Sequence, residues 1–145
     1  MNNYDIAIIG GGASGLAAAI SAARTNKKLK IAVLERLQRI GKKILATGNG
    51  RCNFTNRNVD KSCYYGTCNK LYNICSSYNI EEFFKSLGVY GFADEEGRVY
   101  PLSNSASSVL DGLRLEISSY KNIDVICDFN VTSIKKEREF IIYKQ

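Results

Sequence analysis

The chain has 145 residues, of which 45% are hydrophobic and 23% charged, the balance of an ordinary globular domain. Five cysteines, an odd number without CxxC spacing, argue against a disulfide framework, and a chain without histidine is a poor candidate for a zinc site. The net charge of +6 comes from 20 basic and 14 acidic residues. Because the basic residues are scattered rather than gathered in a stripe, they give little support for a nucleic-acid partner.

The apolar stretch from Ile6 to Ala23 is the one candidate for a targeting or membrane segment. Glycines and serines interrupt it, and no basic segment precedes it. It therefore predicts neither a signal peptide nor a membrane span. We expect a cytoplasmic protein that does not associate with a membrane.

The first third of the chain predicts a β-strand, an α-helix and a second β-strand. Tyr4–Gly10 (YDIAIIG) is a short isoleucine-rich run, typical of a parallel strand buried on both faces. Three glycines end it, and from Ala13 to Thr25 the apolar residues recur at helical spacing. Lys30–Glu35 (KIAVLE) then predicts a second buried strand that ends in an acid.

The later part of the chain begins with a long loop. Residues 36–58 are rich in glycine, asparagine and basic residues, and ordered loops of this length are usually functional. Beyond it, local patterns predict helices at Leu71–Ser77, Asn79–Leu87 and Ser105–Tyr120, a hairpin of Val89–Ala93 with Arg98–Tyr100, and short strands at Ile123–Cys127, Asn130–Lys135 and Phe140–Tyr143.

The glycine motif between the first strand and the first helix indicates a dinucleotide site. Gly10 permits a tight turn, Gly12 lets the backbone approach a diphosphate, and Gly15 lets the helix pack closely on the sheet. The amides and dipole of the helix N-terminus, at Ala13 and Ser14, would hold the diphosphate. Glu35 is placed to accept hydrogen bonds from ribose hydroxyls. The alternative is a glycine turn in an α/β protein that binds no nucleotide.

The long loop favours FAD over NAD as the ligand. A simple NAD domain continues quickly to a further helix and strand after Glu35. Here a glycine-rich loop follows instead, and it offers protein along the length of an extended flavin nucleotide.

Three segments resemble a known family. IIGGGASGLAAAI, VLERLQRIGKKILATGNGRCNFTN and GRVYPLSNSASSVLDGLR are similar to bacterial flavoproteins of the NAD(P)/FAD-dependent oxidoreductase, aminoacetone-oxidase-like family, some of which reduce bile-acid intermediates. The resemblance implies that Lys43 and the segment Thr47–Asn53 line the diphosphate and flavin, and that Val131 lies by the adenine. The candidate cofactor-binding residues are Gly10, Gly12, Ala13, Ser14, Gly15, Glu35, Arg36, Lys43, Thr47, Gly48, Asn49, Gly50, Cys52, Asn53 and Val131.

The fold that follows is an α/β, Rossmann-like FAD-binding domain of the glutathione-reductase type, with a parallel sheet and a small β-meander. Members of the family are much longer than this chain and carry a substrate domain and a late flavin-binding motif. We therefore expect residues 1–145 to be the N-terminal part of the FAD/NAD(P)-binding domain of a truncated or split protein, whose missing C-terminal half completes the site.

We expect the intact protein to pass a hydride or electron pair between NAD(P)H or another small organic molecule and the flavin. No residue of this sequence is assigned a catalytic role, and no metal is expected. Two alternatives stay open. One is a nucleotide-binding module or remnant without turnover, and the other is a flavoprotein that acts on RNA.

The cysteines offer weaker signals. Cys63 and Cys68 have the CxxxxC spacing of flavin-linked disulfide reductases, yet no helix start is predicted around them, which favours ordinary loop thiols. Cys52 lies inside the predicted flavin loop, and we interpret it as a packing residue rather than a nucleophile.

Overall fold

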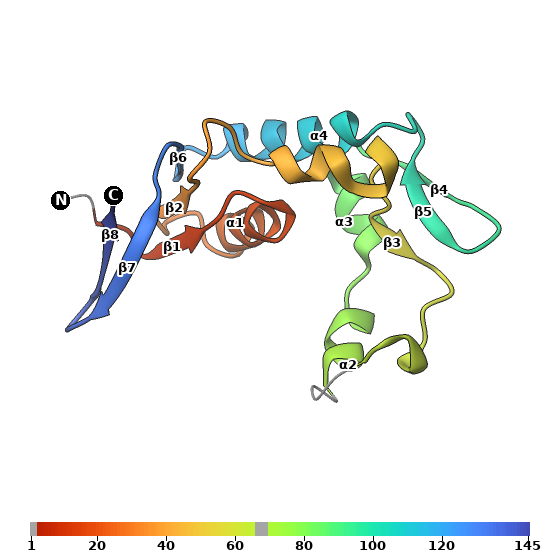
Figure 1. Cartoon of the computed structure of the whole chain (residues 1–145), viewed down its shortest axis with the longest axis horizontal. Coiled ribbons are helices and arrows are strands. Elements are labelled where there is room, and N and C mark those ends of the chain that lie inside the picture. The colour runs from red at the N-terminus through yellow and green to blue at the C-terminus, as the bar shows by residue number, and fades with distance from the viewer. Residues whose placement is uncertain (1–2, 66–69) are drawn as a thin grey trace. The chain divides into compact units, whose positions relative to one another are not determined.

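The computed structural model describes residues 3–65 and 70–145. The chain divides into two compact units (Figure 1). The first unit comprises Met1–Ile44 and Leu113–Gln145, and the second comprises Leu45–Gly112. No helix of the described residues is both long enough and apolar enough to cross a membrane.

A three-stranded parallel sheet forms the centre of the first unit. Its strands are β1 (Ile6–Ile9), β2 (Ile31–Leu34) and β6 (Ile123–Ile126), in the order β1–β2–β6. Four consecutive residue pairs align β2 with each neighbour. Because the strands are parallel, their carboxyl ends share one edge of the sheet, where ligands bind in folds of this class.

Burial differs sharply between the two strands that the sequence predicts to be buried on both faces. All four side chains of β2 are buried, as expected for a strand paired on both sides. In β1, half-buried and exposed side chains alternate, and Ile9 is 50% exposed. The prediction is thus right for β2 and wrong for β1, because among the described residues β1 pairs only with β2 and lies at the edge of the sheet.

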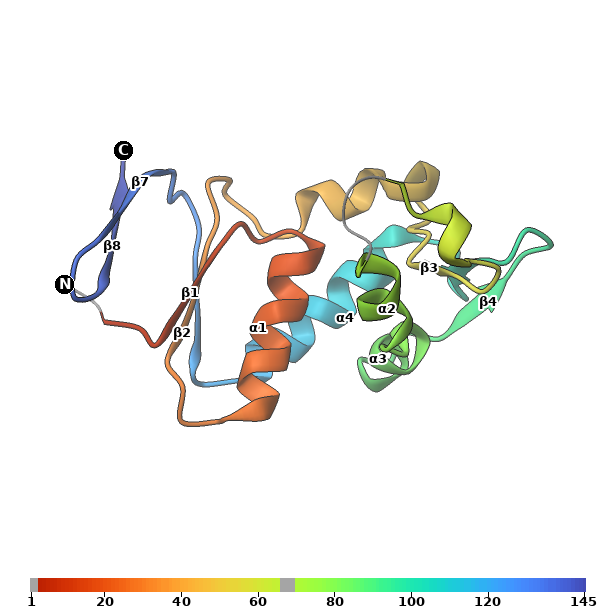
Figure 2. The same cartoon turned by 90° about the horizontal axis from the view of Figure 1, so that it is seen from below.

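Two helices and a hairpin accompany this sheet. Helix α1 (Ala13–Thr25) has the predicted bounds, and its buried side chains include Leu16 and Ile20, each stabilising the fold by about 1.5–3 kcal/mol. Arg24 of α1 forms an ion pair of 2.7 Å with Glu116 of helix α4 (Ala106–Ser119). Figure 2 shows α1 on one side of the sheet and a β-hairpin on the other.

That hairpin joins β7 (Val131–Lys136) and β8 (Phe140–Lys144) as a separate antiparallel sheet. The sequence predicts a small β-meander, and the described residues form a two-stranded hairpin in its place. Most of its side chains are exposed, including Ile134 at 51% and Phe140 at 68%.

The second unit is built on a small antiparallel sheet. The predicted hairpin is present as β4 (Gly91–Ala93) and β5 (Arg98–Pro101), with β3 (Thr55–Asn56) on the other side of β5. Strand β3 was not predicted, because two residues are too few to show an alternating pattern. The described helical segments of the second unit are η2 (Lys61–Cys63), α2 (Leu71–Ser76) and α3 (Ile80–Ser86), together with most of η1 (Lys42–Gly50) and the first half of α4.

The predicted helix at Asn79–Leu87 shows how local signals set its bounds. The Asn79 side chain caps α3 by accepting a hydrogen bond of 3.0 Å from the amide of Glu82. Gly88 follows the helix with a φ of 77°, a conformation that glycine adopts without steric strain. In the second unit, the half-buried rings of Phe54 and Phe84 lie 4.6 Å apart.

Candidate functional site

The glycine turn connects β1 to α1 at the carboxyl edge of the parallel sheet. Gly10 has a φ of 101°, which requires glycine, and its amide donates to the carbonyl of Leu34 on β2 at 2.8 Å. Gly12 precedes α1 in an extended conformation without a side-chain cap. A Cβ on Gly12 would meet no atom within 4 Å, so the space in front of the helix N-terminus is open to a ligand. The first turn of α1 has no acidic residue to compete with an anion.

Gly15 has a different role in the same motif. It is buried, and a Cβ there would overlap the carbonyl oxygen of Gly10 and lie 3.3 Å from the Ile8 side chain. Glycine at this position therefore lets α1 approach the turn and β1. Ala13 and Gly15 are not among the described residues that line the cavity.

Glu35 joins the end of β2 to the glycine turn. One carboxylate oxygen, Oε2, accepts the amide of Gly11 at 2.8 Å, and the other, Oε1, accepts the amide of Leu37 at 2.9 Å. Each carboxylate oxygen offers two acceptor positions, so both retain capacity for a ligand hydroxyl. The carboxylate that the sequence predicts to bind ribose is thus also held in place by two backbone hydrogen bonds.

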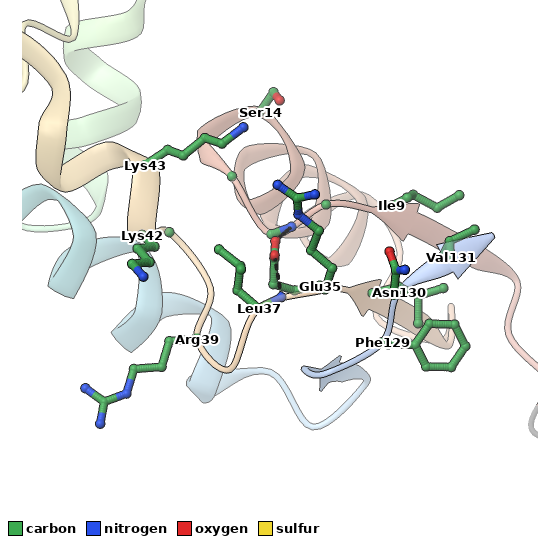
Figure 3. A pocket seen from close by; sticks show the side chains of 16 residues that line it. Ile9, Ser14, Glu35, Leu37, Arg39, Lys42, Lys43, Phe129, Asn130 and Val131 are labelled. Atoms are coloured by element: carbon green, nitrogen blue, oxygen red, sulfur yellow. Dashed lines mark hydrogen bonds between the residues drawn. The ribbon is translucent and has the colours of Figure 1, made fainter. Parts of the chain in front are cut away.

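A cavity of about 410 Å³ lies at this edge of the sheet, entirely within the first unit (Figure 3). Among the described residues that line it, Glu35 is the only acidic one, whereas four are cationic: Arg36, Arg39, Lys42 and Lys43. In Figure 3 the side chain of Lys43 extends toward Ser14 at the start of α1, whereas Arg39 and Lys42 point away from it. The lining therefore suits an anionic ligand.

The segment after β6 closes the other side of the cavity. Val131 lines it, together with Phe129 and Asn130, which the sequence interpretation did not include. The amide of Phe129 donates to the carbonyl of Glu35 at 2.9 Å and so fixes this segment beside the end of β2. Phe129 and Asn130 follow the end of β6 at Ile126 after two intervening residues, and this place near the carboxyl edge of the sheet, rather than a motif, is the signal that could have identified them.

Cys127 lies between β6 and β7, as Phe129 and Asn130 do, and charged groups near it affect its thiol. Burial raises the pKa of its thiol, and the negative charges of Asp128 and Glu35 raise it further. A backbone hydrogen bond at Ile40 and the positive charge of Arg114 act in the opposite direction. Cys127 therefore holds its proton more tightly than an ordinary thiol.

The predicted flavin loop Thr47–Asn53 has an unusual backbone. Gly48, Asn49, Gly50 and Cys52 all have positive φ, and the amide of Cys52 donates to the carbonyl of Thr47 at 3.0 Å. Left-handed conformations at non-glycine residues carry strain and are often found at functional sites. This loop belongs to the second unit, so its contact with the cofactor stays a prediction.

Side chains around the loop hold it in this conformation. With its amide oriented so that the nitrogen faces the two carbonyls, the Asn53 side chain donates to Thr55 and Val99, at 2.7 and 3.2 Å. The guanidinium of Arg51 lies 4.2 Å from the ring centroid of Tyr100. These contacts give the loop a defined shape within the second unit.

The described cysteines differ in their exposure. Cys52 is 7% exposed, in agreement with a packing role. Cys63 is exposed, but Cys68 lies outside the described residues, so the proposed redox pair stays a prediction. Within residues 3–65 and 70–145, no group of three or more cysteines and acidic residues could hold a metal ion.

Comparison with known proteins identifies similar chains. The family model described as HI0933-like protein Rossmann domain matches residues 4–145. The chain is 47% identical over 120 residues to the 3-dehydro-bile acid delta(4,6)-reductase of Clostridium scindens, a match that covers 80% of this chain and 29% of the reductase. It is 36% identical over 64 residues to the ribosomal RNA dihydrouridine synthase of Escherichia coli K12, covering 44% of this chain and 16% of the synthase.

Among solved structures, the Sdh1 complex of Mycobacterium smegmatis in the apo form has the same fold. The TM-score is 0.66 at 15% sequence identity, and the match covers 97% of this chain and 32% of that chain. The chain thus spans about a third or less of the length of each of these proteins.

Proposed function

The chain belongs to the HI0933-like Rossmann-domain family, and from this premise we propose that it is the nucleotide-binding part of an FAD-dependent oxidoreductase. The observation that carries the proposal is the cavity at the carboxyl edge of the parallel sheet. There an open helix N-terminus, a fixed carboxylate and the cationic residues Arg36 and Lys43 line one space. Each of these features matches one part of a dinucleotide.

The residues present fit the charged half of FAD. The amides at the start of α1, with Ser14 and Lys43, would hold the diphosphate. Glu35 would accept hydrogen bonds from the ribose, and Phe129 and Val131 would contact the adenine. Arg36 lines the same cavity and would contribute positive charge. The Thr47–Asn53 loop is proposed to extend the site along the flavin.

The topology favours FAD over NAD. In a simple NAD domain a single helix leads from the second strand to the next parallel strand. Here the sequence of the whole second unit is inserted between β2, which ends at Leu34, and β6, which starts at Ile123. When bound, FAD would supply the redox chemistry, accepting and passing on a hydride, and the chain's own residues would bind and orient it.

The relatives suggest what this part of the chain contributes. One relative is named as a reductase of a bile acid, and the other as a synthase of dihydrouridine, a reduced form of uridine. Their substrates differ greatly, yet each relative resembles a segment of this chain, over 120 and 64 residues respectively. We infer that the segment holds the cofactor that reductive chemistry needs, with NAD(P)H as electron donor and a small organic molecule as substrate of the whole protein.

Titration of the purified chain with FAD tests the proposal, with bound flavin followed by its absorbance and fluorescence. We expect Lys43→Gln to weaken binding about tenfold, because it removes a charge-assisted contact to phosphate. Lys42→Gln is the matched control, since Lys42 points away from Ser14 (Figure 3). A folded chain that binds neither FAD nor ADP would overturn the proposal, and equal losses in both variants would reduce the role of Lys43 to general charge.

A second candidate is that the whole protein acts on RNA. The similarity to the ribosomal RNA dihydrouridine synthase favours it, whereas the scattered basic residues count against it. Binding to ribosomal RNA fragments at several salt concentrations would decide, because each phosphate contact steepens the salt dependence. Weak binding to the RNA fragments that does not change with salt would argue against a role on RNA and favour a small-molecule substrate.

A further inference from the structure

Arg114 contacts the segment that covers the glycine turn. It lies in α4, and its Nη2 donates a hydrogen bond of 2.8 Å to the carbonyl oxygen of Ile40, a residue 74 positions earlier in the chain. Both residues belong to the first unit. The Ile40 side chain is 8% exposed and packs on Gly11, where a Cβ would lie 2.5 Å from Ile40 Cγ2. Arg114 therefore anchors the residue that lies directly over the turn.

The peptide unit between Ile40 and Gly41 connects Arg114 to the glycine turn. Its carbonyl accepts from Arg114, and its amide, on Gly41, donates to the carbonyl of Gly11 at 2.7 Å. The guanidinium and the glycine turn thus bond to opposite ends of one peptide group. A charged donor polarises the peptide that accepts it, which strengthens the next hydrogen bond in the chain.

The Gly11 carbonyl belongs in turn to the peptide unit that contains the amide of Gly12. The described residues contain no cis peptide bond, so in this planar unit the Gly12 amide points away from the Gly11 carbonyl. Gly12 precedes α1 and lines the cavity. Holding the Gly11 carbonyl against Gly41 therefore fixes the direction of a Gly12 amide that lies in the anion site.

We propose that Arg114 is a positioning residue for the diphosphate of the ligand, because it orients the Gly12 amide through two hydrogen-bonded peptide units. This inference rests on the proposed nucleotide-binding function. Arg114 is not among the residues that line the cavity, so its effect would reach the ligand through the backbone rather than by direct contact. This relay, the chain of hydrogen bonds from Arg114 through Ile40–Gly41 to Gly11–Gly12, also explains why the donor is charged, since a neutral donor would polarise the peptides less.

Calorimetric titrations with ADP and with adenosine separate this role from general stabilisation. The two probes share the adenine and ribose, but only ADP has a diphosphate. We expect Arg114→Gln to weaken ADP binding about fivefold and adenosine binding less than about twofold, in keeping with the loss of one charge-assisted hydrogen bond. The matched control is Arg24→Gln, because Arg24 also bonds to α4, through Glu116, but does so from the last turn of α1, whereas the glycine turn precedes the first.

Equal losses for ADP and adenosine in Arg114→Gln would overturn the relay, because they would show a loosened fold. Unchanged ADP affinity would overturn it too, while leaving the nucleotide site intact. If the wild-type chain binds neither probe, the proposed function fails first. Ligand-free amide spectra give an independent test. Arg114→Lys, which keeps the charge but loses the planar fork, should shift the Gly41 and Gly12 amide signals, and unshifted signals would refute the inference.

Discussion

Replacing Gly11 by alanine tests how the segment after β2 is held on the glycine turn. An added Cβ would lie 2.5 Å from Ile40 Cγ2, 3.0 Å from Ile40 Cβ and 3.3 Å from Glu35 Oε2. Carbon atoms pack favourably at about 3.5–4.0 Å, so Ile40 would have to retreat by about 1 Å. Because Ile40 is buried, we expect an overpacking cost of about 1–3 kcal/mol in the free energy of unfolding.

Gly12→Ala is the matched comparison one residue later. Its Cβ would meet no atom within 4 Å, and its backbone is extended with a φ of −82°, which alanine adopts without strain. The stability should therefore stay within about 0.5 kcal/mol of wild type. The methyl group would instead occupy space in front of the helix, and we expect FAD affinity to fall about tenfold or more.

Thermal unfolding and FAD titration of the two variants give opposite expectations. Gly11→Ala should lower Tm by about 3–9 °C, at roughly 3 °C per kcal/mol for a chain of this size. Gly12→Ala should leave Tm unchanged and lose affinity. A Gly11→Ala variant with wild-type Tm would refute the packing of Ile40 on the turn. A Gly12→Ala variant with wild-type affinity would show that the turn does not face the ligand.

Three further outcomes are expected. Glu35→Gln should lower both Tm and FAD affinity, the latter about tenfold, because it removes the charge and replaces one of the two accepting oxygens by an NH2 group that cannot accept from a backbone amide; loss of affinity without loss of Tm would contradict its structural role. Because the pKa of Cys127 is raised, iodoacetamide should modify it more slowly than Cys75 at pH 8, as measured by peptide mass spectrometry; faster modification would refute this. Hydrogen bonds from Arg57 lower the pKa of Glu81, so this pair stabilises the fold above the pKa of the unfolded carboxyl and loses its effect as pH falls through the lowered pKa. Arg57→Gln should therefore destabilise the fold slightly at neutral pH and not at all below the lowered pKa of Glu81, and a pH-independent difference in denaturant titrations would argue against it.

Local patterns predict most elements of the fold correctly. Helix α1 has the expected bounds, and α2, α3, α4 and the β4–β5 hairpin lie within two residues of theirs. These predictions succeed because helix caps, apolar periodicity and turn residues act over a few neighbouring positions. They fail where neighbouring strands determine how deeply a strand is buried. The apolar sequence of β1 is typical of a central strand, although β1 lies at the edge of the described sheet.

The candidate site was predictable to a similar degree. Gly10, Gly12, Ser14 and Glu35 line the cavity as the motif spacing suggests. Phe129 and Asn130 were missed because they have no motif of their own. Only the pairing of β2 with β6 places them beside Glu35.

By itself the sequence determined a strand, a glycine turn, a helix and an acid at the end of the next strand, since each depends on backbone preferences within a few residues. The tertiary structure alone decided that Glu35 holds the amide of Gly11 and that Arg114 holds the carbonyl of Ile40. Hydrogen bonds between such distant positions depend on the path of the chain through space. The two bonds require the parallel sheet to bring β2 beside the turn, and α4 to pack beside the segment that covers it.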